Sequence, residues 1–186
     1  MSEDTLIQFC APTLAGIKSA SLFSCCCESR KQFLEDVRRL NRILTPKGLR
    51  LIPLRLRDGK ALVYLYRPDR LGKDLRSREA QALLRENGYT EADTVRCLSQ
   101  LRRKLQTQDT FPHEIGLFLS YPPEDVRGFM DNGAENSAYT GCWKVYGDVE
   151  KARRIFRSYH HCRECYSRQW TKGAPFERLV VPAARR

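Results

Sequence analysis

The feature that most constrains the fold is an Asp58-Gly59 pair set between two runs of strand-forming residues, within residues 49–67. An Asp-Gly pair favours the tight turn of a β-hairpin, because both residue types tolerate the left-handed backbone that this turn requires. Before the turn, apolar residues alternate with arginines: Ile52, Leu54 and Leu56 against Arg55 and Arg57. The sequence therefore predicts a hairpin with one buried face and one solvated face.

Helical periodicity flanks this hairpin. In residues 29–44 the apolar side chains fall on one stripe, namely Phe33, Val37, Leu40 and Leu44, and Gly48 follows as a terminator. Caps and apolar spacing predict four further helices: residues 74–87, 90–105, 122–132 and 148–173. The second of these opens with a segment, Thr90–Asp93, that resembles a capping box. Two short apolar runs, residues 115–119 and 142–146, are predicted strands.

These patterns predict an α+β fold, with a small mixed sheet, a central hairpin and about five or six helices. We expect a single domain over residues 1–178 and a flexible basic tail over residues 179–186. No apolar run approaches the roughly 20 residues of a membrane-spanning helix, and the acidic N-terminus does not resemble a secretory signal. We therefore expect a cytoplasmic protein with no membrane partner, whose eight cysteines are mostly reduced thiols.

The formal net charge of +11 points first to nucleic acid or an anionic surface. The charge is uneven, because residues 106–150 hold two basic residues against eight acidic ones. A phosphate-contacting face would use seven arginines from other segments: Arg38, Arg39, Arg42, Arg55, Arg57, Arg102 and Arg103. The sequence lacks zinc-finger spacing and the aromatic signature of an RNA-binding sheet, which weakens this interpretation.

One candidate site lies in the acidic region, where His113 and Glu114 precede a predicted strand. A neutral imidazole can act as a general base or metal ligand, and a nearby carboxylate can orient it or add a second ligand. Consecutive strand residues point to opposite faces, so the two need not share a site. An H-E-x-x-H zinc motif is excluded, because Leu117 stands where its second histidine would be. The structural alternative is a capping or core hydrogen bond near Pro112.

Four more candidates for ligand contacts lie in the same region: Tyr121, Trp143, Lys144 and Tyr146. On a strand, Lys144 and Tyr146 would share one face, with Trp143 on the other. Lys144 is one of the two cations of the region, hence either a salt-bridge partner of Glu114 or Asp125 or a ligand-binding cation. The aromatic candidates are stacking platforms or core residues.

A second constellation comprises Cys10, Thr13 and Lys18. Pro12 and Thr13 can open a short helix whose free N–H groups suit an anion, and Lys18 adds positive charge. A thiol near such a helix start would have a lowered pKa and become nucleophilic. The structural alternative for Cys10 is a small buried hydrophobe.

A third constellation comprises His161, Cys162 and Cys165 on the predicted helix of residues 148–173. Their spacing makes them helical neighbours, and with a fourth ligand they could hold zinc or another soft metal. A lone C-x-x-C is a weak signal, and Cys162 falls on the apolar stripe. The consecutive cysteines 25–27 cannot all point the same way.

Longer motifs connect the chain to a family. They read C-A-P-T-L-A-G-I-K-S-A-S-L-F at residues 10–23, L-V-Y-L-Y-R at 62–67, F-P-H-E-I-G-L-F-L-S-Y-P-P-E-D-V-R-G-F at 111–129 and G-C-W-K-V-Y-G-D at 141–148. Together they resemble an uncharacterised bacterial family, a domain of unknown function common in anaerobic Gram-positive bacteria. The resemblance covers nearly the whole chain and implies no activity. The His160-His161 pair, Cys165 and the cysteines 25–27 lie outside its pattern, so a site built on them would be peculiar to this chain.

Two classes of function fit these observations. The first is a small-molecule, metal or cofactor-binding protein, with enzymatic activity left open, whose pocket forms where residues 10–18 meet His113, Glu114 and the strand from Trp143 to Tyr146. It predicts that these remote segments converge on one cleft. The alternative is a basic nucleic-acid-binding or protein-interaction module, which predicts one continuous basic surface. We favour the first, with its cofactor, substrate and reaction undefined.

Overall fold

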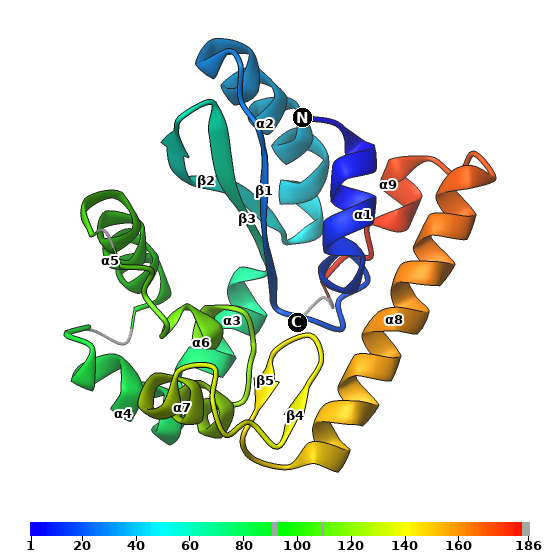
Figure 1. The fold of residues 1–186 in the computed structure, drawn as a ribbon. Coiled ribbons are helices and arrows are strands. Elements are labelled where there is room, and N and C mark those ends of the chain that lie inside the picture. Colours follow the sequence, from blue (N-terminus) through cyan, green and yellow to red (C-terminus); the bar gives the residue numbers. More distant parts are fainter. Residues whose placement is uncertain (91–92, 109, 184–186) are drawn as a thin grey trace. The chain divides into compact units, whose positions relative to one another are not determined.

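The predicted hairpin forms two strands of a three-stranded antiparallel sheet (Figure 1). This computed structural model describes residues 1–90, 93–108 and 110–183. β2 (Arg50–Arg57) and β3 (Lys60–Tyr66) flank the Asp58-Gly59 turn, whose φ angles of 52° and 68° are the left-handed values that the turn needs. β1 (Ala20–Cys26) pairs with the other edge of β3, so the strand order is β1-β3-β2. The hairpin prediction is confirmed.

This sheet differs from the sequence prediction in two ways. It is antiparallel rather than mixed, because β1, which was not among the predicted strands, joins β3 in the antiparallel sense. β2 also contains an irregularity between Pro53 and Arg55, where a proline cannot donate a ladder hydrogen bond. The irregularity breaks the predicted alternation, so that Leu51 and Leu54 are buried and Ile52 is half-buried.

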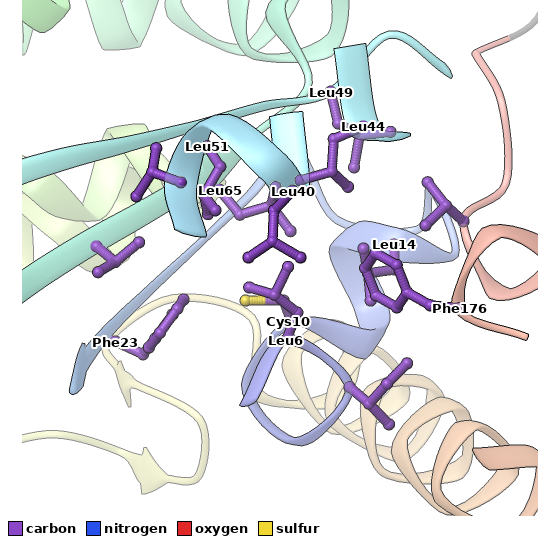
Figure 2. Packing of buried hydrophobic residues seen from close by; sticks show 14 of the residues in the cluster. Leu6, Cys10, Leu14, Phe23, Leu40, Leu44, Leu49, Leu51, Leu65 and Phe176 are labelled. Atoms are coloured by element: carbon purple, nitrogen blue, oxygen red, sulfur yellow. The ribbon is translucent and has the colours of Figure 1, made fainter. Parts of the chain in front are cut away.

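The described chain divides into two compact units, and the first comprises Met1–Asp69 and His161–Arg186. Its core lies between one face of the sheet and two helices, α1 (Glu3–Leu14) and α2 (Arg30–Leu44), with α9 (Phe176–Leu179) adding to it (Figure 1). Figure 2 shows the buried side chains that meet there: Leu6, Cys10, Leu14, Phe23, Leu40, Leu44, Leu49, Leu51, Leu65 and Phe176. The first unit is thus a two-layer arrangement of helices on a sheet.

Local signals set the limits of α2. The helix begins after Ser29, whose hydroxyl accepts a hydrogen bond from the backbone N–H of Gln32. It buries the predicted apolar stripe, Phe33, Val37, Leu40 and Leu44. A 3-10 turn, η1 (Thr45–Lys47), then ends at Gly48, whose φ of 79° is left-handed. The helix predicted at residues 29–44 and its terminator are confirmed.

A buried arginine closes the C-terminal end of α1. Arg67 is 3% exposed and donates from Nε to the carbonyl oxygen of Thr13 at 2.7 Å. Its Nη2 donates to the carbonyl oxygens of Leu14 at 2.8 Å and Val181 at 2.7 Å. The last carbonyls of a helix lack intrahelical partners and form the negative end of its dipole, so a cation suits this position.

The C-terminal segment is fixed to the first unit by backbone hydrogen bonds. Val181 N donates to the carbonyl oxygen of Leu14, and Ala183 N donates to that of Lys47. Val180 is buried. The expectation of a flexible tail from residue 179 onward therefore does not hold for residues 179–183, while residues 184–186 lie outside the described residues.

The second unit, Arg70–His160, is mainly helical. Its elements in chain order are α3 (Pro68–Leu75), which begins at the end of the first unit, α4 (Arg78–Glu86), α5 (Thr94–Thr107), α6 (Ile115–Phe118), α7 (Pro123–Asn132), β4 (Tyr139–Thr140), β5 (Lys144–Val145) and the first part of α8 (Val149–Thr171). β4 and β5 pair in the antiparallel sense. The helix predicted at residues 122–132 is confirmed as α7.

Two helix predictions in this unit are corrected. The segment 74–87 is divided between α3 and α4 rather than forming one helix, because the hydroxyl of Ser77 caps a new helix start. α5 begins after Asp93, whose carboxylate accepts a 3.0 Å hydrogen bond from the N–H three residues on. Thr90 was predicted to cap this helix, and residues 91 and 92 of that capping box lie outside the described residues.

The predicted strand at residues 115–119 is wrong, because these residues form the short helix α6. Turn-like hydrogen bonds lead into it, from the N–H groups of Ile115 and Gly116 to the carbonyl oxygens of Pro112 and His113. Periodicity cannot separate a short buried strand from a buried helix, which explains the error. Of the strand predicted at residues 142–146, only the two residues of β5 form a strand. The α+β class is confirmed, although the described chain holds nine α-helices rather than five or six.

The long helix predicted near the C-terminus is confirmed as α8, with 23 residues. Asp148 caps its start, since its Oδ1 accepts a 2.9 Å hydrogen bond from the N–H of Lys151. Ala152, Phe156 and Tyr159 form its buried stripe. Neither α8 nor any other helix in the described part of the chain combines the length and apolar character needed to cross a membrane.

Candidate functional site

A cavity of about 430 Å³ lies in the second unit, where α6, α7 and the loop between β4 and β5 meet. Its described lining is mostly aromatic and aliphatic: Phe111, His113, Ile115, Gly116, Leu119, Tyr121, Asp125, Val126, Phe129, Cys142, Trp143 and Lys144. Four of the residues proposed from the sequence thus line one cavity, namely His113, Tyr121, Trp143 and Lys144. Glu114, Tyr146 and residues 10–18 are not part of this lining.

A buried carboxylate fixes the loop that closes the cavity. Asp125, in the first turn of α7, is 3% exposed. Its Oδ2 accepts from Nε1 of Trp143 at 2.7 Å, and its Oδ1 accepts from the backbone N–H groups of Tyr146 and Gly147 at 2.8 Å each. Hydrogen bonds to an ionised acceptor are the strong ones, and an acidic group suits a helix N-terminus. Asp125 therefore holds Trp143 and the end of β5 against α7.

The aromatic walls of the cavity contact one another directly. Tyr121 and Trp143 stack with ring centroids 4.7 Å apart and an interplanar angle of 26°. Trp143 also forms a T-shaped pair with Phe156, with ring centroids 4.4 Å apart and an interplanar angle of 82°. Across the lining, His113 packs edge-on against Phe129 at 5.0 Å. Such stacked and edge-to-face pairs are the favourable aromatic geometries, so two aromatic neighbours hold Trp143 in place.

Two glycines allow the elements around the cavity to approach closely. A Cβ atom on Gly116 of α6 would lie 2.7 Å from Cγ2 of Val126 on α7. A Cβ atom on Gly128 would lie 2.3 Å from Cγ of Tyr146. Both distances are shorter than carbon atoms tolerate, so any larger side chain would push these elements apart. Tyr146 is thereby a packing residue, and its hydroxyl donates to the carbonyl oxygen of Gly133 at 2.6 Å.

Two basic side chains of the lining have no polar partner among the described residues. Lys144 is half-buried, and its ammonium makes no ion pair or hydrogen bond within residues 1–90, 93–108 and 110–183. His113 is exposed at the cavity. Within the same described residues its side chain forms no hydrogen bond or ion pair, and its ring packs against the ring of Phe129. Of the two roles predicted for Lys144, that of salt-bridge partner is wrong, because its ammonium contacts neither Glu114 nor Asp125.

Glu114 belongs to a buried cluster that does not include His113. Its Oε1 accepts hydrogen bonds from Nζ of Lys104 at 2.6 Å and from the hydroxyl of Tyr89 at 3.2 Å. Burial, followed by the negative charge of Glu114, raises the pKa of Tyr89. A buried carboxylate paired with one ammonium is a structural ion pair. The proposed joint action of His113 and Glu114 therefore has no geometric support.

Cys10 and Thr13 lie inside the first unit rather than at a helix start. α1 runs from Glu3 and contains Pro12 in its last turn, so the prediction that Pro12 and Thr13 open a helix is wrong. Cys10 lies among packed apolar side chains (Figure 2). This burial raises the pKa of its thiol to about 12, the opposite of the lowered pKa expected. The hydroxyl of Thr13 pairs with that of Ser21 at 2.8 Å. Cys10 is thus the buried hydrophobe of the alternative interpretation.

The cysteines of α8 form pair contacts only. Sγ of Cys165 lies 3.5 Å from Nε2 of His161, and Arg168 approaches the same sulfur at 3.5 Å. Burial raises the pKa of Cys162 to about 11. In the part of the chain that the structure describes, no three His, Cys, Asp or Glu side chains converge as a metal site would need. The metal site predicted there stays a prediction without geometric support.

The arginines of the nucleic-acid alternative fall in both units. Five of them lie in Met1–Asp69, on α2 and β2, and two lie on α5 of Arg70–His160. Arg39 contacts Glu3 at 3.1 Å, and Arg57 contacts its neighbour Asp58 at 3.3 Å. Exposed pairs of this kind contribute little to stability. The nucleic-acid and protein-interaction alternative stays a prediction.

Comparison with known proteins gives one match. A family model described as a protein of unknown function (DUF3793) matches residues 6–180. No curated protein and no solved structure matches the chain significantly. The match confirms the resemblance drawn from the motifs at the level of an uncharacterised family, and it assigns no activity.

Proposed function

Because the chain belongs to the DUF3793 family of proteins of unknown function, we propose its function from the cavity itself: the protein binds a small-molecule ligand there. The observation that carries this proposal is the cavity lining, in which rigid aromatic walls surround two basic side chains, Lys144 and His113, that have no polar partner among the described residues. Ligand sites are typically cavities of roughly 300–1,000 Å³ with apolar walls and few polar groups.

The proposed site is smaller than the sequence suggested, since residues 10–18 and Glu114 contribute nothing to the lining. A second group often orients a histidine that acts as a base toward a nucleophile, and among the described residues no carboxylate contacts His113. The proposal is therefore one of binding. A cytoplasmic location belongs to the same proposal, supported by the eight cysteines, none of which forms a disulfide in the described part of the chain.

The test is a titration with N-phenyl-1-naphthylamine, an uncharged aromatic probe that fluoresces in apolar sites. Trp143 is one of two tryptophans, so in a Trp170→Phe background its emission reports directly on the cavity. We expect saturable binding of about one probe per chain, with quenching of Trp143.

Two variants localise the probe. Ile115→Phe fills the cavity, and Phe111→Ala removes an aromatic wall that is 41% exposed, so the second change has little effect on folding. Both should weaken binding, whereas Val95→Ala, at a 68% exposed position of the same unit, should not. Binding that is absent from the wild type, or unchanged in both cavity variants, would refute the proposal.

A further inference from the structure

We infer that the ligand is a flat aromatic molecule with one anionic group, whose ring lies against the aromatic walls and whose anionic group is bound by Lys144. This inference rests on the proposed function and names the chemical class of ligand for the same cavity. It is carried by the shape of the walls, by the pairing of every lining carboxylate, and by the residue types that the lining lacks.

The walls favour a planar ligand. Four lining residues are aromatic: Phe111, Tyr121, Phe129 and Trp143. Tyr121 stacks on the buried ring of Trp143, and the aromatic side chains of the lining can form stacked or edge-to-face contacts with an aromatic ligand. The hydrogen bond from Trp143 to Asp125 and the ring contact between Trp143 and Phe156 hold the Trp143 side chain in place before a ligand binds. A preorganised wall loses little side-chain entropy on binding.

The charges favour an anion. The single carboxylate among the described lining residues, Asp125, already accepts three N–H hydrogen bonds and is 3% exposed, so its oxygens are not available to a ligand. The nearby Glu114 is neutralised by Lys104. Lys144 is a half-buried residue of the same lining, and its ammonium forms no ion pair with any described residue. An anionic ligand would supply a counter-charge and recover part of the lost solvation.

The lining also argues against polar ligands. Within the described lining there is no arginine, serine, threonine, asparagine or glutamine. Sugars and polyphosphates need many hydrogen-bond donors and acceptors, and leaving them unpaired in an apolar cavity is costly. One ammonium, with the imidazole of His113 as a second donor, suits one carboxylate or sulfonate group.

The inference is tested by comparing two probes that differ in charge. 8-Anilino-1-naphthalenesulfonate contains the N-phenylnaphthylamine framework of the uncharged probe and adds one sulfonate group. We expect the wild type to bind the anionic probe about tenfold more tightly than the uncharged one, which corresponds to about 1.4 kcal/mol. Lys144→Met should abolish this preference, and Lys144→Arg should preserve it.

The matched control is Lys151→Met, which removes the same charge from an exposed position of the same unit outside the cavity. It should leave the preference unchanged. If Lys144→Met fails to fold, added salt provides a second readout in the wild type, where it should weaken only the anionic probe. Equal affinity for both probes, or a preference that survives in folded Lys144→Met, would overturn the inference while the proposed function stands. Failure of both probes to bind would instead reject the proposed function.

Discussion

The hydrogen bonds of Asp125 give a sharp test of how the cavity is held together. Asp125→Asn keeps the shape of the side chain but leaves one acceptor oxygen in place of two. That oxygen can serve either Nε1 of Trp143 or the backbone N–H groups of Tyr146 and Gly147, which now contact different carboxylate oxygens. The amide NH₂ replaces the other carboxylate oxygen and cannot accept a hydrogen bond, so at least one buried N–H loses its partner. We expect a loss of about 2 kcal/mol in the free energy of unfolding.

Urea unfolding of four proteins measures this effect: wild type, Asp125→Asn, Trp143→Phe and the double variant. For a chain of this size, about 2 kcal/mol also corresponds to a fall of about 4–8 °C in Tm. Trp143→Phe removes the indole donor, so in that background the asparagine can turn its oxygen to the backbone groups. The cost of Asp125→Asn should then fall by about 1 kcal/mol, which is a typical coupling for residues in contact. An equal cost in both backgrounds would show that Asp125 does not act through Trp143.

Two further predictions concern the first unit. Arg67→Lys should lower the free energy of unfolding by about 3 kcal/mol, because one ammonium cannot reach all three carbonyl oxygens that the buried guanidinium now satisfies; an unchanged urea midpoint would contradict this account of the helix end. The thiol of Cys10 ionises near its usual pKa of 9.0 in the unfolded chain and only near 12 in the folded one. Its contribution to stability is therefore complete below pH 9 and is lost as the pH rises toward 12, by up to about 1.4 kcal/mol per pH unit. Unfolding midpoints measured across this range should fall less steeply for Cys10→Ala than for the wild type, and parallel slopes would refute the burial argument.

The candidate site was predictable in part. His113, Tyr121, Trp143 and Lys144 stood out as rare or isolated residue types, and the structure places them around one cavity. The sequence places Asp125 at the start of a helix after two prolines and offers it as a salt-bridge partner of Lys144. Its true partners, an indole and two backbone N–H groups from the segment after β5, could not be found by local pattern.

Several elements of the fold follow from local signals in the sequence. The Asp58-Gly59 turn, the stripe and terminator of α2 and the cap of α8 are set by residues a few positions apart, and all three predictions are confirmed. The pairing of β1 with β3 and the helical form of residues 115–118 depend instead on tertiary contacts. So do the pairing of Glu114 with Lys104 and that of Asp125 with Trp143. These outcomes depend on burial and on partners distant in the chain. Short apolar runs and single charges have no preferred state until such partners are in place.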